Sequence, residues 1–91
     1  MKKILFILMF PVLCFGQTED EFYNSGIDKF DLKDYYGAIT DFTKAIELNP
    51  NSPDAYDNRG TSKWYLKQNY CPDYKKACEL GDCTNYNKFC K

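Results

Sequence analysis

The chain has 91 residues, of which 44% are hydrophobic and 27% are charged, and its formal net charge is -1. This length favours one small domain, and an acidic balance without a dense Lys/Arg cluster argues against a nucleic-acid-binding protein. No histidine is present, and the sequence contains no hydrolase, Walker or dinucleotide-binding fingerprint. We therefore expect neither enzymatic activity nor a cofactor or metal site.

The N-terminus has the order of a secretory signal peptide. Two lysines precede an apolar run over residues 4–15, which is shorter than the roughly 20 residues that span a bilayer. We expect a signal peptide over residues 1–16, cleaved after Gly16, and an exported product, periplasmic or secreted, without stable membrane insertion. An uncleaved anchor remains an alternative. Lipid attachment at Cys14 is disfavoured because the bulky Leu13 precedes it.

Two helices are expected in the first half of the mature chain. Thr18 and Glu21 form a capping box for a helix that runs to about Leu32. Asp34 can cap a second helix, whose apolar residues recur at intervals of three and four until Pro50 ends it. The opposite, polar face of this second helix is expected to carry Asp41, Lys44 and Glu47.

A third helix is expected from Pro53 to about Lys67, after Ser52. The chain repeats itself at an offset of 34 residues up to Tyr70, and then at an offset of 32. The second copy has therefore lost two residues near Cys71. Identical pairs at the first offset include Asp20 with Asp54, Asn24 with Asn58, Gly26 with Gly60, Lys29 with Lys63, and Lys33 with Lys67.

The repeat resembles the tetratricopeptide repeat (TPR) family, whose units are helix-turn-helix pairs of 34 residues. The first copy matches that pattern at Phe22, Gly26, Phe30, Tyr35, Ala38, Phe42, Ala45 and Pro50. The second copy matches it at Tyr56, Gly60, Trp64 and Tyr70, but no alanine corresponds to Ala38.

This resemblance implies an all-α fold, a short solenoid of about two antiparallel repeats within residues 17–91. Repeat 1 is expected at about 19–52, a degenerate repeat 2 at about 53–80, and a C-terminal cap at 81–91. A glycine inside a helix costs about 1 kcal/mol relative to alanine, so we expect each repeated glycine at a close helix approach. Helix packing is expected to involve Gly26, Gly60, Ala38, Phe42 and Ala45.

The resemblance also implies a partner-binding surface on the inner, concave side of the first helix of each repeat. There, a repeated asparagine can hold a peptide backbone, because a carboxamide both donates and accepts hydrogen bonds. The positions that match are Asn24 and Asn58, with Tyr23, Ile27, Asp57 and Thr61 beside them. The family's basic clamp for a carboxylate terminus is not matched, since Tyr23 and Asp57 stand where a base or an asparagine would be needed. Ordinary exposed polar residues are the alternative interpretation.

Charge is unevenly distributed along the mature chain. Residues 17–57 contain ten acids and three bases, and residues 58–91 contain three acids and seven bases. This asymmetry could steer partners, although solvated helix faces would have the same composition.

Four cysteines remain after cleavage, at Cys71, Cys78, Cys83 and Cys90. An even number in a small exported domain favours disulfides, and neither zinc spacing nor a C-x-x-C redox motif occurs. Within one helix Cys71 and Cys78 would lie about 10 Å apart, too far to bridge. If Gly81 turns the chain into an antiparallel helix, the geometry predicts Cys71–Cys90 and Cys78–Cys83. Metal binding and redox activity remain alternatives.

Two functions therefore remain open. The first is an interaction module that binds a peptide or protein segment on its concave face outside the cytoplasm. The second is a disulfide-stapled structural protein that associates with itself and has no peptide ligand. A stable dimer with an occluded inner face would support the second function.

Overall fold

The computed structural model describes residues 18–91, and within this range the chain forms helices and no strands. The expected signal peptide over residues 1–16 lies outside the described residues. None of the helices between residues 18 and 91 combines the length and the apolar character needed to cross a membrane. The helices are α2 (Glu19–Asp31), α3 (Tyr35–Leu48), α4 (Pro53–Tyr65), α5 (Cys71–Glu79) and α6 (Thr84–Phe89).

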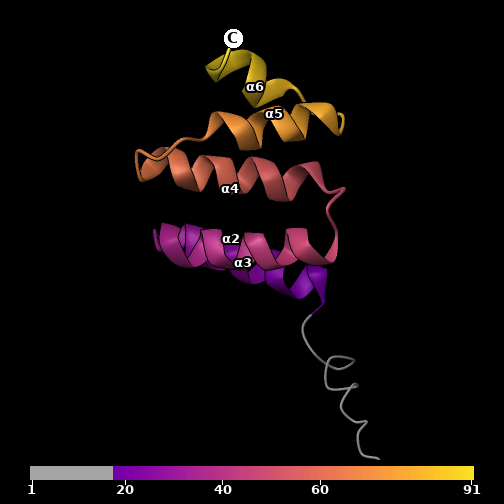
Figure 1. The fold of residues 1–91 in the computed structure, drawn as a ribbon. Helices are drawn as coiled ribbons and strands as arrows, with labels where there is room; N and C mark the ends of the chain where they lie inside the picture. Colours follow the sequence, from indigo (N-terminus) through magenta and orange to yellow (C-terminus); the bar gives the residue numbers. More distant parts are fainter. Residues whose placement is uncertain (1–17) are drawn as a thin grey trace, which may run out of the picture.

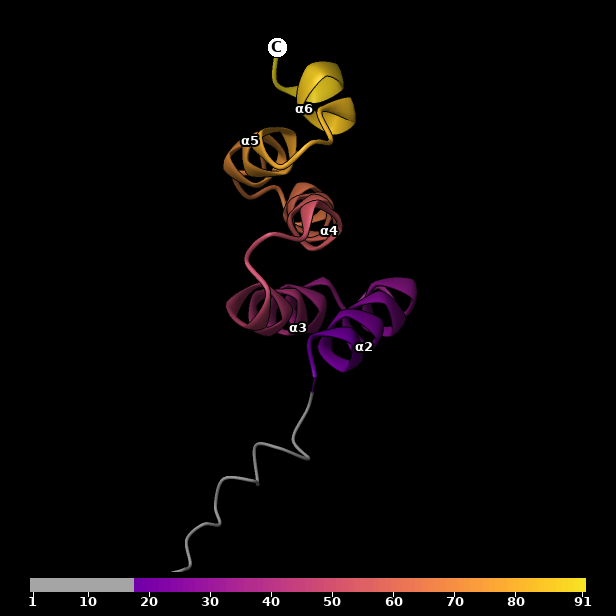
Figure 2. The same cartoon turned by 90° about the vertical axis from the view of Figure 1, so that its right-hand side faces the viewer.

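Consecutive helices pack side by side in one continuous stack, from α2 and α3 at one end to α6 at the other (Figure 1). Seen along the helices, α2, α4 and α6 lie on one side of the stack, and α3 and α5 lie on the other (Figure 2). The predicted all-α repeat architecture is thus confirmed. The first helices of the successive units share one face of the molecule.

Side-chain caps define where the first two helices begin. The capping box of Thr18 and Glu21 is formed in both directions, and Asp34 accepts a hydrogen bond from the Gly37 amide at 3.0 Å. Ser52 occupies the N-cap of α4 as predicted, but its side chain makes no capping hydrogen bond. The proline at the first helical position is sufficient to set the backbone there.

The turns after α2 and α4 have the same backbone conformation. Lys33 and Lys67 adopt positive φ angles of 65° and 61°. The next amide in each turn returns to the helix, from Asp34 to the Lys29 carbonyl and from Gln68 to the Lys63 carbonyl, at 2.8 Å in both. A residue in the left-handed backbone conformation commonly ends a helix in this way. The chain therefore reverses direction through the same turn in both repeats.

Close helix contacts occur at the two repeated glycines. A Cβ atom on Gly26 would lie 2.6 Å from the Phe42 ring, and one on Gly60 would lie 2.9 Å from the Tyr74 ring. Both rings are buried, and Ala38, Ala45, Ala55 and Ala77 beside them are fully buried. The absence of a side chain at each glycine therefore lets the second helix of the repeat approach the first.

The prediction that Asp41 lies on the polar face of its helix is wrong. Asp41 is only 6% exposed. It accepts a hydrogen bond from Ser25 at 2.6 Å and pairs with Lys29 at 3.0 Å, both on α2. The periodicity of one helix does not reveal that the neighbouring helix supplies a cation for this position. Lys44 and Glu47 are exposed as expected.

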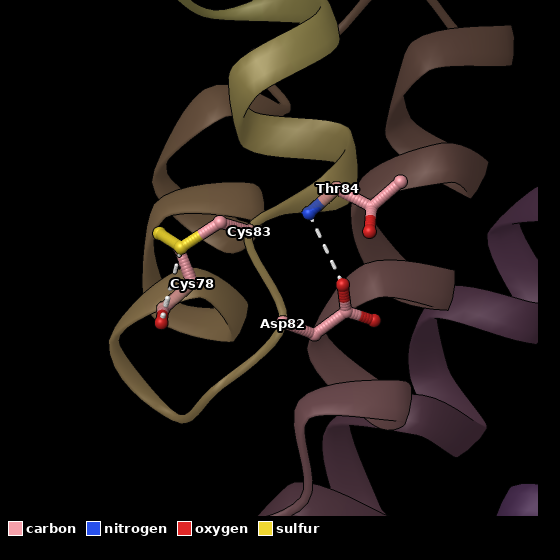
Figure 3. The surroundings of a disulfide bond; sticks show 4 residues. All are labelled: Cys78, Asp82, Cys83 and Thr84. Atoms are coloured by element: carbon pink, nitrogen blue, oxygen red, sulfur yellow. Dashed lines mark hydrogen bonds between the residues drawn. A yellow bond between two sulfur atoms is a disulfide. The ribbon is translucent and has the colours of Figure 1, made fainter.

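Two disulfides close the C-terminal hairpin. Cys71 is bonded to Cys90, with their Cα atoms 5.8 Å apart, and Cys78 is bonded to Cys83. This is the pairing that the antiparallel hairpin predicts. The second bridge lies at the α5–α6 turn, where Asp82 accepts a hydrogen bond from the Thr84 amide at 3.1 Å (Figure 3).

Candidate partner-binding face

All six residues predicted to bind a partner lie on α2 and α4, the first helices of the two units. Tyr23, Asn24 and Ile27 lie on α2, and Asp57, Asn58 and Thr61 lie on α4. The Asn58 side-chain amide donates a hydrogen bond to the Tyr23 hydroxyl at 2.8 Å. This bond joins the first helices of the two repeats directly, so the polar residues of α2 and α4 around Tyr23 and Asn58 form one surface.

Exposure differs among these residues. Asn24 is exposed, and its side chain makes no hydrogen bond within residues 18–91. Tyr23, Ile27, Asn58 and Thr61 are half-buried. The Tyr23 ring packs against Phe42 with ring centroids 5.7 Å apart, and burial raises the pKa of its phenol, with the Asp54 carboxylate adding to the effect. Tyr23 is therefore both a core contact and part of the surface.

Thr61 is bonded mainly to its own protein. Its hydroxyl donates to the Asp57 carbonyl at 3.0 Å, and it also shares a 2.8 Å hydrogen bond with the Tyr74 hydroxyl of α5. These contacts fix its position beside the Tyr74 hydroxyl. Of the six predicted residues, Asn24 is the one whose polar group is most accessible to a ligand.

Asp57 is a buried acid rather than a surface group. It is 8% exposed, and its Oδ1 atom has no hydrogen-bond partner among the described residues. Burial raises the pKa of Asp57 to about 6, a contact with Asn85 of α6 opposes this effect, and the negative charge of Asp82 adds to it. The Asp82 pKa is in turn lowered by the hydrogen bond from the Thr84 amide. These acids lie where α4 meets the start of α6.

A cavity of about 310 Å³ on this face was not predicted from the sequence. It lies where α4, α5 and α6 meet and is lined by Thr61, Trp64, Tyr65, Tyr74, Asn85, Lys88 and Phe89. Among the predicted site residues only Thr61 contributes to it. The available signal was the spacing of Asn85, Lys88 and Phe89, which places these three on one side of a helix.

The described part of the chain holds no group of three or more Cys, Asp or Glu side chains that could bind a metal ion. Its four cysteines are all in disulfides. The polar groups that line the cavity include an amide, hydroxyls and one lysine, which recognise other molecules by hydrogen bonding and charge.

Comparisons with known proteins agree with this architecture. A family model described as TPR repeat matches residues 27–66. Protein STIP1 homolog of Dictyostelium discoideum is 42% identical over 67 residues, which cover 71% of this chain. The matched segment spans only 12% of the length of that relative. No solved structure matches the chain.

Proposed function

The chain belongs to the tetratricopeptide repeat family, and on this premise we propose that it is a non-enzymatic interaction module that binds a peptide or protein segment on the face of α2, α4 and α6. Repeats of this family generally bind protein partners. The finer assignment, to an extended segment on this face outside the cytoplasm, is our proposal.

The observation that carries the proposal is the hydrogen bond between Asn58 and Tyr23. It joins α2 to α4 at 2.8 Å and holds the Asn58 carboxamide at a defined position on the surface. Asn24 occupies the equivalent position one repeat earlier and is exposed. Two carboxamides at equivalent positions of adjacent units can each donate to and accept from the backbone of one extended peptide.

Disulfides support a location outside the cytoplasm. Both bridges of the C-terminal hairpin would be reduced in a cytosolic environment, and they persist in the periplasm and in secreted proteins. The basic and apolar N-terminal segment supports the same location.

Intact-mass analysis should find a mature protein that begins at or near Gln17. A product that retains Met1, or one that begins at Cys14 with added acyl mass, would contradict cleavage at this site.

The function can be tested by affinity capture from the native envelope or culture fluid, followed by binding measurements with the captured protein. Asn24→Ala should lower affinity roughly fivefold, since it removes an exposed hydrogen-bonding group worth about 1 kcal/mol. Asn58→Ala should do the same and also lower stability slightly, because Tyr23 loses its donor. Asn51→Ala is the matched control on an exposed loop. Unchanged affinity in both test variants would contradict the proposed face.

Self-association is the alternative that exposed apolar residues favour. Leu32 is 79% exposed and Tyr36 is 67% exposed, at the junction of α2 and α3. Such residues could form an interface between copies. Sedimentation over a range of concentrations distinguishes the two functions: a monomer that binds its partner supports the interaction module, and a stable dimer that blocks Asn24 supports the structural protein.

A further inference from the structure

The cavity between α4 and α6 has aromatic walls that remain open to solvent. Trp64 is 44% exposed and Phe89 is 41% exposed, and their ring centroids lie 6.5 Å apart. Tyr74 forms the floor, only 2% exposed, with its ring 6.0 Å from that of Phe89. A volume of about 310 Å³ accommodates one large side chain of a ligand against the exposed surfaces of Trp64 and Phe89.

The charged side chains that line the cavity and the hollow next to it are lysines. Lys88 is the only charged residue that lines the cavity. On the other side of Trp64 and Tyr65 lies a second hollow, of about 500 Å³, in which Lys67 is likewise the only charged residue. Neither Lys67 nor Lys88 forms an ion pair within residues 18–91, whereas Arg59 and Lys63 are both paired with Asp73. The exposed Trp64 and Tyr65 rings thus have one unpaired lysine in each neighbouring hollow. Such a surface complements a ligand that carries an apolar side chain with carboxylates beside it.

The outer wall of the cavity depends on the two disulfides. Helix α6 has six residues, none of them buried, and a helix this short is not stable by itself. Cys83 precedes its first residue and is bonded to Cys78 (Figure 3). Cys90 follows its last residue and is bonded to Cys71. Both ends of α6 are therefore attached to α5, and the attachment holds Asn85, Lys88 and Phe89 opposite Trp64.

We propose that this disulfide-held cavity is the anchor site for one aromatic side chain of an acidic peptide segment. The aromatic ring packs against the exposed surfaces of Trp64 and Phe89, and carboxylates on either side of it pair with Lys88 and Lys67. This inference rests on the proposed interaction function and adds the chemistry of the segment that is bound. It also makes the oxidised hairpin a requirement for binding.

Trp64 provides a direct probe, because the sequence contains a single tryptophan. The oxidised protein is titrated with a short synthetic peptide that has one phenylalanine between aspartates, and Trp64 fluorescence is recorded. The same peptide with alanine in place of phenylalanine should bind roughly tenfold more weakly or worse, because the anchor is lost. A peptide with lysines in place of the aspartates should also bind more weakly. Equal binding of the three peptides, or no binding of the first, overturns the proposal.

Variants then locate the site. Phe89→Ala should weaken binding of the phenylalanine peptide roughly tenfold, and Lys88→Glu should weaken it several-fold, with less effect at high salt. Lys75→Glu is the matched control, since Lys75 is an exposed residue of α5 outside both hollows and the variant has the same net charge. Circular dichroism verifies that each variant retains its helices. Loss of binding in the control to the same extent would mean that net charge alone drives the association.

A separate outcome distinguishes this inference from the proposed function. If the partner captured from the cell bound more weakly to Asn24→Ala but equally well to Phe89→Ala, the face would be correct and the anchor site wrong. Reduction provides an independent check. Reduced protein that keeps its helical signal should no longer respond to the phenylalanine peptide, and a response retained after reduction would contradict the role of the hairpin.

Discussion

The two helical hairpins of the described chain, α2–α3 and α4–α5, share the same internal contacts but differ at their ends. Each packs a helical glycine against an aromatic ring, Gly26 on Phe42 and Gly60 on Tyr74. Each also buries one aspartate of the second helix against a lysine of the first, Asp41 with Lys29 and Asp73 with Lys63. The repeat is thus conserved within the chain as a set of contacts, not only as a sequence pattern.

The difference lies in the second helix of each unit. α3 has 14 residues and packs between α2 and α4, while α5 has 9 residues and packs between α4 and the short α6. The second unit has additional constraints: Arg59 also binds Asp73, and two disulfides attach α6. Both units bury apolar residues, among them Phe42 in the first unit and Tyr74 in the second. The second unit, whose second helix is shorter, is therefore held by charge and covalent bonds in addition to apolar burial.

Breaking the Cys71–Cys90 bridge should have the largest effect. In the chain-entropy model a bridge across 19 residues stabilises by about 3 kcal/mol, so Cys71→Ser with Cys90→Ser should lower the melting temperature by on the order of 10 °C. Cys78→Ser with Cys83→Ser is the comparison, and its effect should be smaller because that loop is short. Equal melting temperatures for the wild type and the first variant would show that the second unit does not need its covalent closure.

The next largest difference between the two units is expected when their buried aspartates are neutralised. Asp73→Asn leaves Arg59 and Lys63 without a counter-ion at side-chain exposures of 19% and 25%, and should cost about 2 kcal/mol in the free energy of unfolding. Asp41→Asn should cost about 1 kcal/mol, because Lys29 is 40% exposed and can be hydrated. Chemical denaturation measures both.

Glu79→Gln is the control for these charge changes. Glu79 pairs with Lys76 at 4.0 Å on the surface, and its loss should change stability by less than about 0.5 kcal/mol. A larger cost at Asp41 than at Asp73 would contradict the conclusion that the second unit depends more on charge.

Adding a methyl group at the repeated glycines tests the contact that the units share. Gly26→Ala and Gly60→Ala should each lower stability by about 1 kcal/mol or slightly more, because the new Cβ would overlap the Phe42 or Tyr74 ring. The effect should be larger at Gly26, where the contact is closer. Phe42→Leu combined with Gly26→Ala should cost less than the sum of the two single changes. If the two changes were fully additive, the cost of Gly26→Ala would not come from overlap with the Phe42 ring.

The effect confined to one pH range concerns Asp57, which in the second unit occupies the position of Tyr23 in the first. Burial raises the pKa of Asp57 to about 6 in the folded protein, from an ordinary value of 3.8 that applies to the unfolded chain. The folded state therefore holds a proton that the unfolded state releases between about pH 4 and pH 6, and this group lowers stability as the pH rises through that window. Asp54, Asp82 and Asn85 are the groups that face it.

Asp57→Asn should remove this dependence. The variant should be more stable than the wild type by about 1 kcal/mol at pH 7 and should lose that advantage at pH 4. Asp54→Asn, a change at an exposed residue, is the matched control and should alter the profile little. Parallel pH profiles for the wild type and Asp57→Asn would show that burial of this acid has no cost.

Much of the fold was predictable because its information is local. The capping box at Thr18, the cap at Asp34 and the end of α3 before Pro50 each depend on a few neighbouring residues. The disulfide pairing was also predictable, because two short antiparallel helices joined at Gly81 bring only one set of cysteines together. The repeat offset added the close approaches at Gly26 and Gly60, since a glycine that recurs inside a helix has a cost that packing must offset.

The candidate site was predictable only in part. The sequence placed Asn24 and Asn58 at equivalent positions of two units, but the hydrogen bond from Asn58 to Tyr23 depends on the distance between α2 and α4. It also gave no sign that Trp64 would stay 44% exposed beside α6. Exposure of that ring depends on how far α6 extends over α4.

The sequence by itself determined the helices, the repeat and the cysteine pairing. Only the tertiary structure decided which polar residues are buried and where the molecule is hollow, as Asp41, Asp57 and the cavity at Phe89 show. The physical reason is that periodicity identifies only the apolar face of each helix. A helix in the stack packs against two neighbouring helices, so a polar residue outside the apolar face can also be buried. Asp41 is polar by periodicity and is nevertheless buried, because α2 supplies Ser25 and Lys29 at hydrogen-bonding distance.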